Sequence, residues 1–504
     1  MNALAATAGV IAMAFAILVT YLVSVSGVPF APLALGQAII EAMPGWISVP
    51  LIEALRYWAQ RLLVLGVIGL YLVDGAATGI AAADRRVRTS AVAGLAALPW
   101  LATVVLGVLL AGEKIDLASA LLGSAIGAAA FFGGLTFLLS AERVSTAAAA
   151  TRRRALLTGA AAAAALAVLA IVLGGTVRAA RAQVSTVVTA ARRLRSREPV
   201  AAGAAAFEAI DHLEKRITAN EDHYTVDTTL IKPRVDASTW QLAFGGEVER
   251  PFSISYNELL DMEALERPHT LECISNEIGG DLISTAVWTG VPLADLFARA
   301  GPKASAYDVV LTSVDGYTDS IRIAKALDPD TMVAYLMNGF PLPEAHGYPA
   351  RALIPGIYGM KNVKWLSKID VVTFDFQGYW MERGWSDIAT YNTHVRIDAP
   401  PVSTRAVDGK IVIAGIAFAG QRGISRVEVS TDGGASWTAA ELEPAPGRHT
   451  WVRWRYVWTP AAAARHRLVA RATDGTGAVQ TSVRRPPFPN GSTGYDSQEI
   501  SVTA

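Results

Sequence analysis

The 504-residue sequence contains a single cysteine, Cys273, in the stretch HTLECISNEIGG. One thiol cannot form an intrachain disulfide, so a disulfide framework is excluded within this chain. An iron–sulfur cluster is excluded as well, because it needs about four thiolates or a mixture of cysteine and histidine. The formal net charge is zero, and the composition therefore gives no reason to expect a nucleic acid as partner.

Charged residues are scarce too, at 17% of the chain against about 25% in an ordinary soluble protein. The deficit lies in the first 177 residues. A bilayer crossing needs about 20 predominantly apolar residues. The sequence therefore predicts an all-α membrane domain over residues 1–177, with five transmembrane helices. Their expected ranges are 4–28, 62–83, 90–111, 117–140 and 155–177. The first range has a signal peptide as its alternative, although it lacks a basic start and is long for that role.

The arginines between these segments predict the orientation. Arg85, Arg86 and Arg88 follow the second span, and residues 152–154 (Arg-Arg-Arg) precede the fifth. By the positive-inside rule both loops are cytoplasmic, which places the amino terminus inside and the chain after residue 177 outside. The basic stretch 178–197 runs against this rule, and we interpret it as a surface helix on anionic headgroups.

The motif TRRRALL at residues 151–157 allows two interpretations. Paired arginines before an apolar run are typical of twin-arginine export, which carries folded and cofactor-loaded domains. The alternative is that these arginines only set the topology.

Histidine is also missing from the membrane part, since the first one in the chain is His212. A membrane b-type haem needs axial histidines, so the usual haem–quinone anchor is excluded. Asp74 is the only charge well inside an expected span. An intramembrane carboxylate indicates function, or else it lies at an irregular helix junction eased by nearby glycines. Gly123 and Gly127 form a pair with small side chains that favours close helix packing.

The composition of the sequence changes after about residue 200, where charged residues, proline and tryptophan become more frequent. A basic linker over 178–204 leads into an expected α+β domain over 205–398, with strands at 239–243 and 308–314 and a short helix at 292–300. From 399 to 504 the apolar pattern alternates with the strand period, and STDGGASW at 430–437 is typical of a hairpin turn. About seven short strands predict an all-β sandwich of immunoglobulin type.

Three chemistries remain open for Cys273 on this basis. A lone cysteine is often a small buried hydrophobe, but it can be a nucleophile beside a histidine or a thiolate ligand of a metal. The segment 344–366 carries His346, Arg351, Lys361 and Lys364 among glycines and prolines. Such a turn-rich basic segment suits a phosphate or another anion, unless its cations only pair with surface carboxylates.

Several motifs in the right order resemble the sulfite oxidase family over residues 215–504. VAYLMNGFPLPEAHGYPARALIPGIYGMKNVKWL resembles its molybdenum cofactor domain, and TLECISNE resembles its cysteine segment. VDTTLIKPRVDASTWQL resembles its entry strand, and GIAFAGQRGISRVEVSTDGGASW resembles its carboxy-terminal immunoglobulin-like domain. The membrane part lies outside this resemblance.

The resemblance implies one molybdopterin per chain, with molybdenum bound by a dithiolene, oxo groups and the thiolate of Cys273. It implies no haem or iron–sulfur cluster in this chain, and dimerisation through the sandwich domain. The remaining cofactor-binding positions that it implies are Tyr224, Thr225, Asp315, His346, Arg351, Asn362, Val363 and Lys364.

The sequence departs from the family where a sulfite oxidiser binds its substrate. Asp227, after Val226, stands where such members carry an arginine, and Glu277-Ile278 replaces a pair of arginines. Trp385 stands near the expected tyrosine, and Arg455 is a loose match to an arginine of the sandwich domain. A dianion needs converging cations, so these changes disfavour sulfite. A sulfoxide or N-oxide is at least as well matched.

We therefore expect a membrane-anchored molybdoenzyme that transfers an oxygen atom on the outer face of the membrane. Its partners would be membrane lipid, a small-molecule substrate, and a separate electron carrier or quinone. Two alternatives remain open, namely a true sulfite dehydrogenase and a non-catalytic sensor or transporter.

Overall fold

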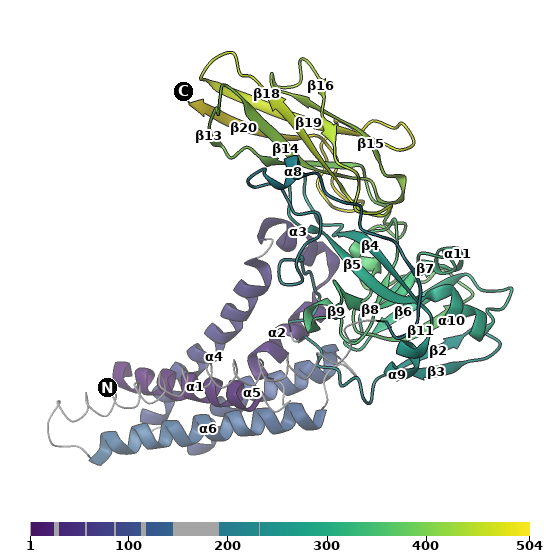
Figure 1. The fold of residues 1–504 in the computed structure, drawn as a ribbon. Helices are drawn as coiled ribbons and strands as arrows, with labels where there is room; N and C mark the ends of the chain where they lie inside the picture. The colour runs from purple at the N-terminus through teal and green to yellow at the C-terminus, as the bar shows by residue number, and fades with distance from the viewer. Residues whose placement is uncertain are drawn as a thin grey trace. The chain divides into compact units, whose positions relative to one another are not determined.

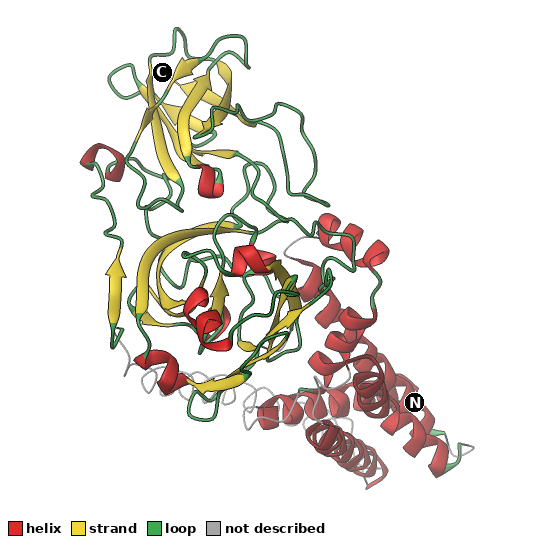
Figure 2. Cartoon of the chain, turned by 90° about the vertical axis from the view of Figure 1, so that its right-hand side faces the viewer, coloured by secondary structure: helices red, strands yellow, loops and turns green. Residues whose placement is uncertain are grey.

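The computed structural model describes residues 2–24, 30–55, 58–84, 87–111, 117–144, 191–230 and 232–503 (Figure 1). The chain forms two compact units. One comprises Met1–Ser185 together with Asp227–Lys232, and the other comprises Thr186–Val226 and Pro233–Ala504. The described part of the first unit is almost entirely helical, whereas strands dominate the second (Figure 2).

Four helices of the first unit are long and apolar enough to cross a membrane. They are α1 (Asn2–Ser24), α4 (Ala59–Ala83), α5 (Thr89–Ala111) and α6 (Leu117–Val144). Each coincides with one of the first four expected spans. The fifth expected span, 155–177, lies outside the described residues, as do Arg85, Arg86 and the arginines at 152–154. These apolar helices are compatible with membrane insertion.

Two further helices, α2 (Ala31–Ala42) and α3 (Gly45–Leu55), were not expected from the sequence. They are joined by a sharp bend of 115°. With 12 and 11 residues, each is too short to cross a bilayer alone. A search for segments of about 20 residues therefore passes over them. Pro44 lies at the break, where it cannot continue α2.

Small residues let the helices approach closely. A Cβ atom on Gly75 of α4 would lie 2.8 Å from the carbonyl oxygen of Gly9 on α1 and 2.7 Å from Met13 Cβ. Gly127 of α6, which the sequence marked as a packing position, lies directly against the indole ring of Trp100. The apolar helices thus meet through shape complementarity, which is the main attraction between helices surrounded by lipid.

The basic stretch before the second unit folds differently from the expectation. Leu194–Arg197 form strand β1, which pairs in parallel with β4 (Ala264–Glu272). The predicted surface helix over 178–197 is therefore wrong for this part. Its arginines bind carboxylates of the protein itself. Arg195, for example, donates to Asp295 at 2.5 Å. The preceding residues to 190 lie outside the described part.

The first part of the second unit contains two sheets. Their strand orders are β1-β4-β5-β8-β10, with β9 on β8, and β3-β2-β11-β6-β7. The strands are β2 (Gln241–Gly246), β3 (Phe252–Ser255), β5 (Ile283–Pro292), β6 (Asp308–Ser313), β7 (Thr318–Arg322), β8 (Met332–Met337), β9 (Phe340–Pro341), β10 (Arg351–Leu353) and β11 (Leu366–Val372). The short helices are α8 (Ala205–Glu208), α9 (Tyr256–Asp261), α10 (Leu293–Ala300) and α11 (Ile323–Ala326). The expected strands near 239 and 308 and the expected helix at 292–300 are present.

Apolar runs explain why some strands are central. All six residues of β8, MVAYLM, are buried, as a continuous hydrophobic strand requires. Gly301, in the left-handed conformation, ends α10. Leu296 and Phe297 of this helix belong to the core that also contains Phe244 and Val333.

The last part of the second unit is built from strands, as predicted. Two sheets have the orders β12-β14-β18-β17 and β13-β20-β19-β15-β16. Their members are β12 (His394–Ala399), β13 (Ser403–Arg405), β14 (Ile411–Phe418), β15 (Ile424–Ser430), β16 (Thr438–Ala439), β17 (Glu441–Leu442), β18 (Val452–Trp458), β19 (Arg465–Asp474) and β20 (Asp496–Thr503). Buried side chains from both sheets, among them Ile413, Trp454 and Leu468, form one core. The immunoglobulin type stays a prediction.

The contact between α1 and α4 can be tested with Gly75→Leu. The added side chain would force the two helices apart, and overpacking of this kind costs about 1–3 kcal/mol. We expect a lower midpoint of thermal unfolding in detergent. Gly69→Leu on the same helix is the control, because a Cβ atom there meets nothing within 4 Å. Equal midpoints for the two variants would contradict this packing.

Candidate functional site

Cys273 lies directly after the last residue of β4, at the start of a loop that returns into β5. Its backbone N–H donates to the Leu282 carbonyl at 2.9 Å, and its carbonyl accepts from the Asn276 N–H at 3.0 Å. The side chain is only 8% exposed. Its Sγ atom lies 3.0 Å from the Ser275 hydroxyl. The thiol is therefore fixed at the end of a tight loop.

Asn276 holds this loop in shape through its side chain. Its amide donates to Glu272 Oε1 at 3.0 Å, and its amide oxygen accepts from the Leu282 N–H at 3.0 Å. Asn276 is 1% exposed, so both bonds form away from water. Because a buried amide is costly to leave unpaired, this asparagine strongly favours one loop conformation.

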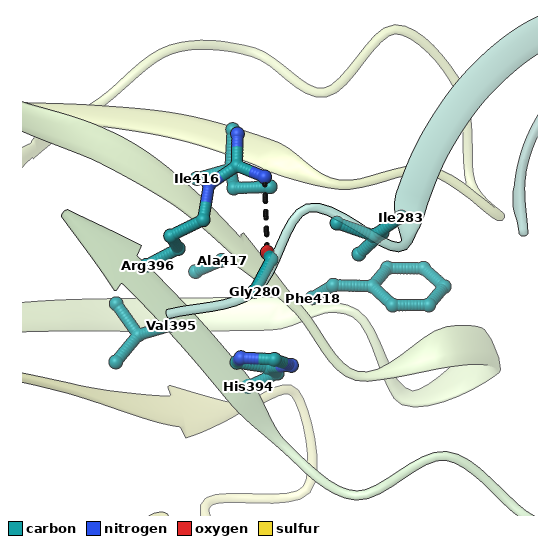
Figure 3. Close-up of a pocket in the computed structure, with 8 residues that line it drawn as sticks. All are labelled: Gly280, Ile283, His394, Val395, Arg396, Ile416, Ala417 and Phe418. Carbon is teal, nitrogen blue, oxygen red and sulfur yellow. Dashed lines mark hydrogen bonds between the residues drawn. The ribbon is translucent and has the colours of Figure 1, made fainter. Parts of the chain in front are cut away.

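Strands and loops of the sandwich support the same loop from the other side. His394 Nδ1 of β12 lies 2.6 Å from Glu272 Oε1, and the Ser492 hydroxyl donates to the Asn276 carbonyl at 2.7 Å. Figure 3 shows Arg396 directed at the Gly280 carbonyl, to which it donates at 3.2 Å. The Cys273 loop is thus held jointly by the α+β part and the sandwich.

The groups around Cys273 shift the pKa of its thiol in opposite directions. Burial raises the pKa of the thiol, and the hydrogen bonds of Ser275 lower it. Glu272 raises this pKa further, whereas the positive charge of Lys364 lowers it. A bound divalent or higher-valent metal would outweigh the effect of burial, because coordination deprotonates a thiol outright.

The second half of the site is the segment from η4 (Glu344–His346) to β11. Arg351 is 5% exposed, and its guanidinium donates to the Asn362 carbonyl at 2.8 Å and to the His346 carbonyl at 3.3 Å. Asn362 in turn accepts from the Ile354 N–H at 2.6 Å. Lys364 Nζ donates to the Ala345 carbonyl at 3.1 Å. These bonds place two cations on one rigid turn.

His223 joins this cationic turn, although the sequence analysis did not single it out. Its ring lies edge-on to His346, with centroids 5.1 Å apart. Burial lowers the pKa of His223 well below its usual value, and His346, Arg351 and Lys364 lower it further. His223 Nε2 is buried and has no hydrogen-bond partner among the described residues. The sequence could have indicated His223, because it directly precedes Tyr224, which is one of the expected cofactor-binding residues.

This arrangement fits a bound anion. Four basic side chains converge, and the charged neighbours that shift the pKa of His223 are all basic. The desolvated guanidinium of Arg351 gains from an acceptor oxygen. The residues present therefore fit the phosphate of a pterin cofactor, with the thiol of Cys273 as the soft donor for its metal.

Tyr224 connects the two halves. Burial raises its pKa well above the usual value, and the proximity of Cys273 adds to this increase. Its backbone N–H donates to the Ser284 hydroxyl at 3.1 Å. A Cβ atom on Gly359 would lie 2.6 Å from the Tyr224 hydroxyl and 3.3 Å from the Glu272 carbonyl. Only glycine at this position allows the cofactor segment to approach the Cys273 loop so closely.

A cavity of about 370 Å³ opens beside Tyr224. It is also lined by Thr225, Ile283 and Ser284. The charged residues of its lining are Glu214, Lys215, Asp222 and Asp281. Three carboxylates and one ammonium group therefore surround the opening, which disfavours entry of a dianion.

Two further expected cofactor residues, Asp315 and Val363, have only local contacts in the structure. Asp315 lies in the turn after β6, where its carboxylate accepts from the Tyr317 N–H at 3.1 Å. The side chain of Val363 is 1% exposed and belongs to the hydrophobic core. Their hydrogen bonds and packing are local, so the structure gives them a supporting position.

The four expected substrate residues are also dispersed. Glu277 lies in the Cys273 loop, where its carbonyl accepts from the Gly280 N–H at 2.9 Å. Trp385 is buried against Phe488, with ring centroids 5.2 Å apart, and its indole N–H has no partner among the described residues. Asp227 belongs to the helical unit.

Arg455 is placed differently from the expectation. On β18, its guanidinium pairs with Glu441 at 2.7 Å and donates to the Ala206 carbonyl at 3.3 Å. Its partners therefore belong to the sandwich and to the segment around α8, and the structure does not bring it to the Cys273 loop. The loose match of this arginine to the family explains the difference.

Two buried tyrosines near the loop also escaped the sequence analysis. The rings of Tyr358 and Tyr391 lie 4.9 Å apart. Burial raises the pKa of both, and the carboxylate of Glu272 raises it further. Nothing in the spacing of Tyr391 marks it, because only the fold brings this loop residue beside β4.

Comparison with known proteins identifies two matched domains in this chain. Residues 229–380 match the oxidoreductase molybdopterin binding domain, and residues 389–485 match the Mo-co oxidoreductase dimerisation domain. Mitochondrial sulfite oxidase of Rattus norvegicus is 30% identical over 323 residues, which cover 54% of this chain and 59% of that protein. Sulfite oxidase of Arabidopsis thaliana is 30% identical over 266 residues, which cover 43% of this chain and 68% of that protein.

Among solved structures, the sulfane dehydrogenase SoxCD from Paracoccus pantotrophus has a similar fold. The TM-score is 0.51 at 24% identity, over 58% of this chain and 85% of that chain. The chain spans less than two thirds of the length of the mammalian sulfite oxidase. The two matched domains, the Arabidopsis relative and the geometry of Cys273 lead to one conclusion: this chain belongs to the sulfite oxidase family of molybdenum-cofactor oxidoreductases.

Proposed function

We propose that this chain is a membrane-anchored oxidoreductase that transfers an oxygen atom between a small neutral molecule and water on the outer face of the membrane. The observation that carries the proposal is the pairing of a fixed thiol, Cys273, with the basic cluster of His223, His346, Arg351 and Lys364, of which the first three are buried. A metal-binding thiol beside an anion site is what a phosphorylated metal cofactor requires.

The bound molybdenum cofactor supplies two-electron redox chemistry and oxygen-atom transfer. The chain's own residues supply position and electrostatics. Cys273 would be the protein's ligand, and Asn276 and Glu272 fix the loop that carries it. The basic cluster would hold the phosphate. Tyr224 and Thr225 line the opening through which a substrate reaches the site.

A sulfoxide or an N-oxide suits this opening better than sulfite. The cavity carries three carboxylates, Glu214, Asp222 and Asp281, against the single cation of Lys215. Glu277 occupies the Cys273 loop where sulfite oxidisers are expected to have arginine. A neutral substrate with a polar oxygen avoids the repulsion that a dianion would meet. The competing candidate is a sulfite dehydrogenase, which the similarity to named sulfite oxidases favours.

The rest of the chain suggests how the enzyme is anchored and where its electrons go. The apolar helices α1, α4, α5 and α6 would hold the enzyme in the membrane with its amino terminus in the cytoplasm. Two electrons per turnover would pass to or from a separate carrier or a quinone. The region matched to the dimerisation domain supports a homodimer. A non-catalytic sensor or transporter would instead function fully without molybdenum.

The first test concerns the metal ligand. Wild-type protein purified in detergent should contain about one molybdenum per chain, as a single thiolate ligand implies. Cys273→Ser should keep its fold and pterin but lose turnover by more than about 100-fold, because the hydroxyl is a poor ligand for this metal. Molybdenum analysis, pterin fluorescence and steady-state kinetics check this. A wild-type protein without molybdenum would sink the enzyme proposal.

The second test concerns the basic cluster. Arg351→Leu removes a buried charge-assisted donor, which contributes about 1.5–3 kcal/mol, so we expect roughly tenfold to 100-fold weaker retention of the pterin. Dialysis followed by pterin quantification measures the retention. Arg455→Leu is the matched control, because this arginine pairs with Glu441 on the sandwich. Equal pterin loss in both variants would contradict the role of the cluster.

The third test concerns the substrate. Sulfoxides, N-oxides and sulfite are screened with artificial electron donors and acceptors on molybdenum-replete protein. We expect turnover with a neutral oxygen donor or acceptor and a high KM for sulfite. Asp281→Asn should lower the KM for sulfite by about twofold to fivefold, the size of one screened surface charge. Saturation by sulfite at low concentration in wild type would establish the competing candidate.

A further inference from the structure

One face of β12 is directed away from the core of the sandwich. Val395 and Ile397 of this strand belong to that core. Because successive side chains of a strand point to opposite faces, His394 and Arg396 lie on the other face. The strand and the cavity of about 370 Å³ belong to the same compact unit of the chain. This face of β12 can therefore contact the residues around the cavity.

Arg396 makes three polar contacts from this face. Its Nε atom donates to Asp398 Oδ1 at 2.5 Å. One terminal nitrogen donates to the Gly280 carbonyl at 3.2 Å (Figure 3), and the other donates to Glu214 Oε2 at 3.0 Å. A guanidinium presents its donors as a rigid planar fork, so this one side chain holds two distant segments against the strand.

The two distant contacts reach both walls of the cavity. One wall comes from the segment 214–225 and the other from the segment 281–284. Arg396 binds Glu214, the first residue of the first wall, through its side chain. It also binds the carbonyl of Gly280, which directly precedes the second wall. Arg396 therefore bridges the two walls at the point where each begins.

The start of the first wall depends on this bridge. Further along, a backbone hydrogen bond from the Thr218 N–H to the Thr285 carbonyl, at 2.7 Å, ties the first wall to the strand that follows the second. The N–H groups of Glu214 and Lys215 donate instead to the carboxylates of Asp398 and Glu214, at 3.1 Å and 3.2 Å. Both carboxylates also bind the guanidinium, which fixes their orientation.

The anchor itself is buried and firmly backed. The side chains of Arg396 and Asp398 are 11% and 6% exposed. Burial raises the pKa of Asp398, and the charge of Arg396 lowers it, so the guanidinium stabilises the ionised carboxylate. A Cβ atom on Gly415 of β14 would collide with the Arg396 carbonyl oxygen, so glycine lets the two strands lie close together here.

We propose that Arg396 is a specificity-determining positioning residue of the cavity. By holding the start of the first wall against the loop of Cys273, it sets the width of the opening through which a substrate passes. This inference rests on the proposed function, because it assigns substrate selection to that same cavity. It also gives the sandwich a part in choosing the substrate.

The first experiment tests the contact without relying on activity. Amide hydrogen exchange is measured by mass spectrometry on the full-length holoenzyme in detergent, in peptides that cover residues 212–218. In Arg396→Leu the amides of Glu214 and Lys215 should exchange about threefold to tenfold faster, because the carboxylates that accept from them lose their common partner. Exchange that stays at the wild-type rate overturns the proposal.

Two further variants make this experiment decisive. Arg471→Leu is the matched control, because Arg471 pairs with Glu428 at 2.9 Å within the sandwich. Equal acceleration in Arg471→Leu and Arg396→Leu would show general loosening of the sandwich and would overturn the proposal. Arg396→Lys keeps the charge but not the planar fork, so it should show a smaller acceleration. Its result decides the question if Arg396→Leu does not fold.

The second experiment measures substrate selection in the molybdenum-replete enzyme. Selection is the ratio of kcat/KM between the accepted neutral substrate and its homologues with longer alkyl groups. In Arg396→Leu and Arg396→Lys this ratio should shrink by about threefold, because a released wall admits larger molecules. Arg471→Leu should keep the wild-type ratio. A loss of kcat/KM by the same factor for every homologue would indicate a merely structural role and would overturn the proposal.

The two experiments also distinguish this inference from the proposed function. If the wild type turns over none of the candidate substrates, the proposed function fails, and the exchange experiment still decides whether Arg396 holds the wall. If exchange accelerates while the ratio of kcat/KM values stays unchanged, the proposed function stands and the role of Arg396 in selection fails.

Discussion

The site depends on the hydrogen bonds that close the loop from Glu272 to Leu282. Asn276 spans this loop with its two amide atoms, while His394 and Ser492 brace it from the sandwich. A thiolate ligand must point in one direction to bind a metal, and a loop in water would not hold that direction. The sandwich therefore contributes to the site itself, because part of the loop's support comes from its residues.

Electrostatics divide the site into two regions of opposite character. Around His223 and Arg351 the protein gathers basic side chains, and the desolvated guanidinium of Arg351 favours an anion. Around the cavity beside Tyr224 it concentrates carboxylates instead. The first region suits a cofactor that carries a phosphate, and the second repels a small dianion. Substrate choice depends on such a site and not on the fold.

The helical unit is more than a set of apolar spans. Its short bent pair α2–α3 places Gln37 where it can bind the backbone of the entry segment. Small residues such as Gly9 and Gly75 let the long helices pack closely, so this unit has a defined internal structure.

The sequence by itself determined the features that depend on local pattern. Four apolar stretches became α1, α4, α5 and α6, and the motifs around Cys273 and Arg351 indicated the cofactor and the family. Hydrophobic length and short motifs are properties of consecutive residues, so no tertiary information was needed. The same reasoning passed over α2 and α3, because neither reaches the length of a span.

Only the tertiary structure decided the features that depend on distant residues. It turned the basic stretch at Leu194–Arg197 into a strand, because β4 and nearby carboxylates were there to pair with it. It brought His223 and Tyr391 to the site, and it gave Arg455 a partner elsewhere. Burial and partner choice arise from contacts between segments far apart in the chain, and a linear sequence does not specify these contacts directly.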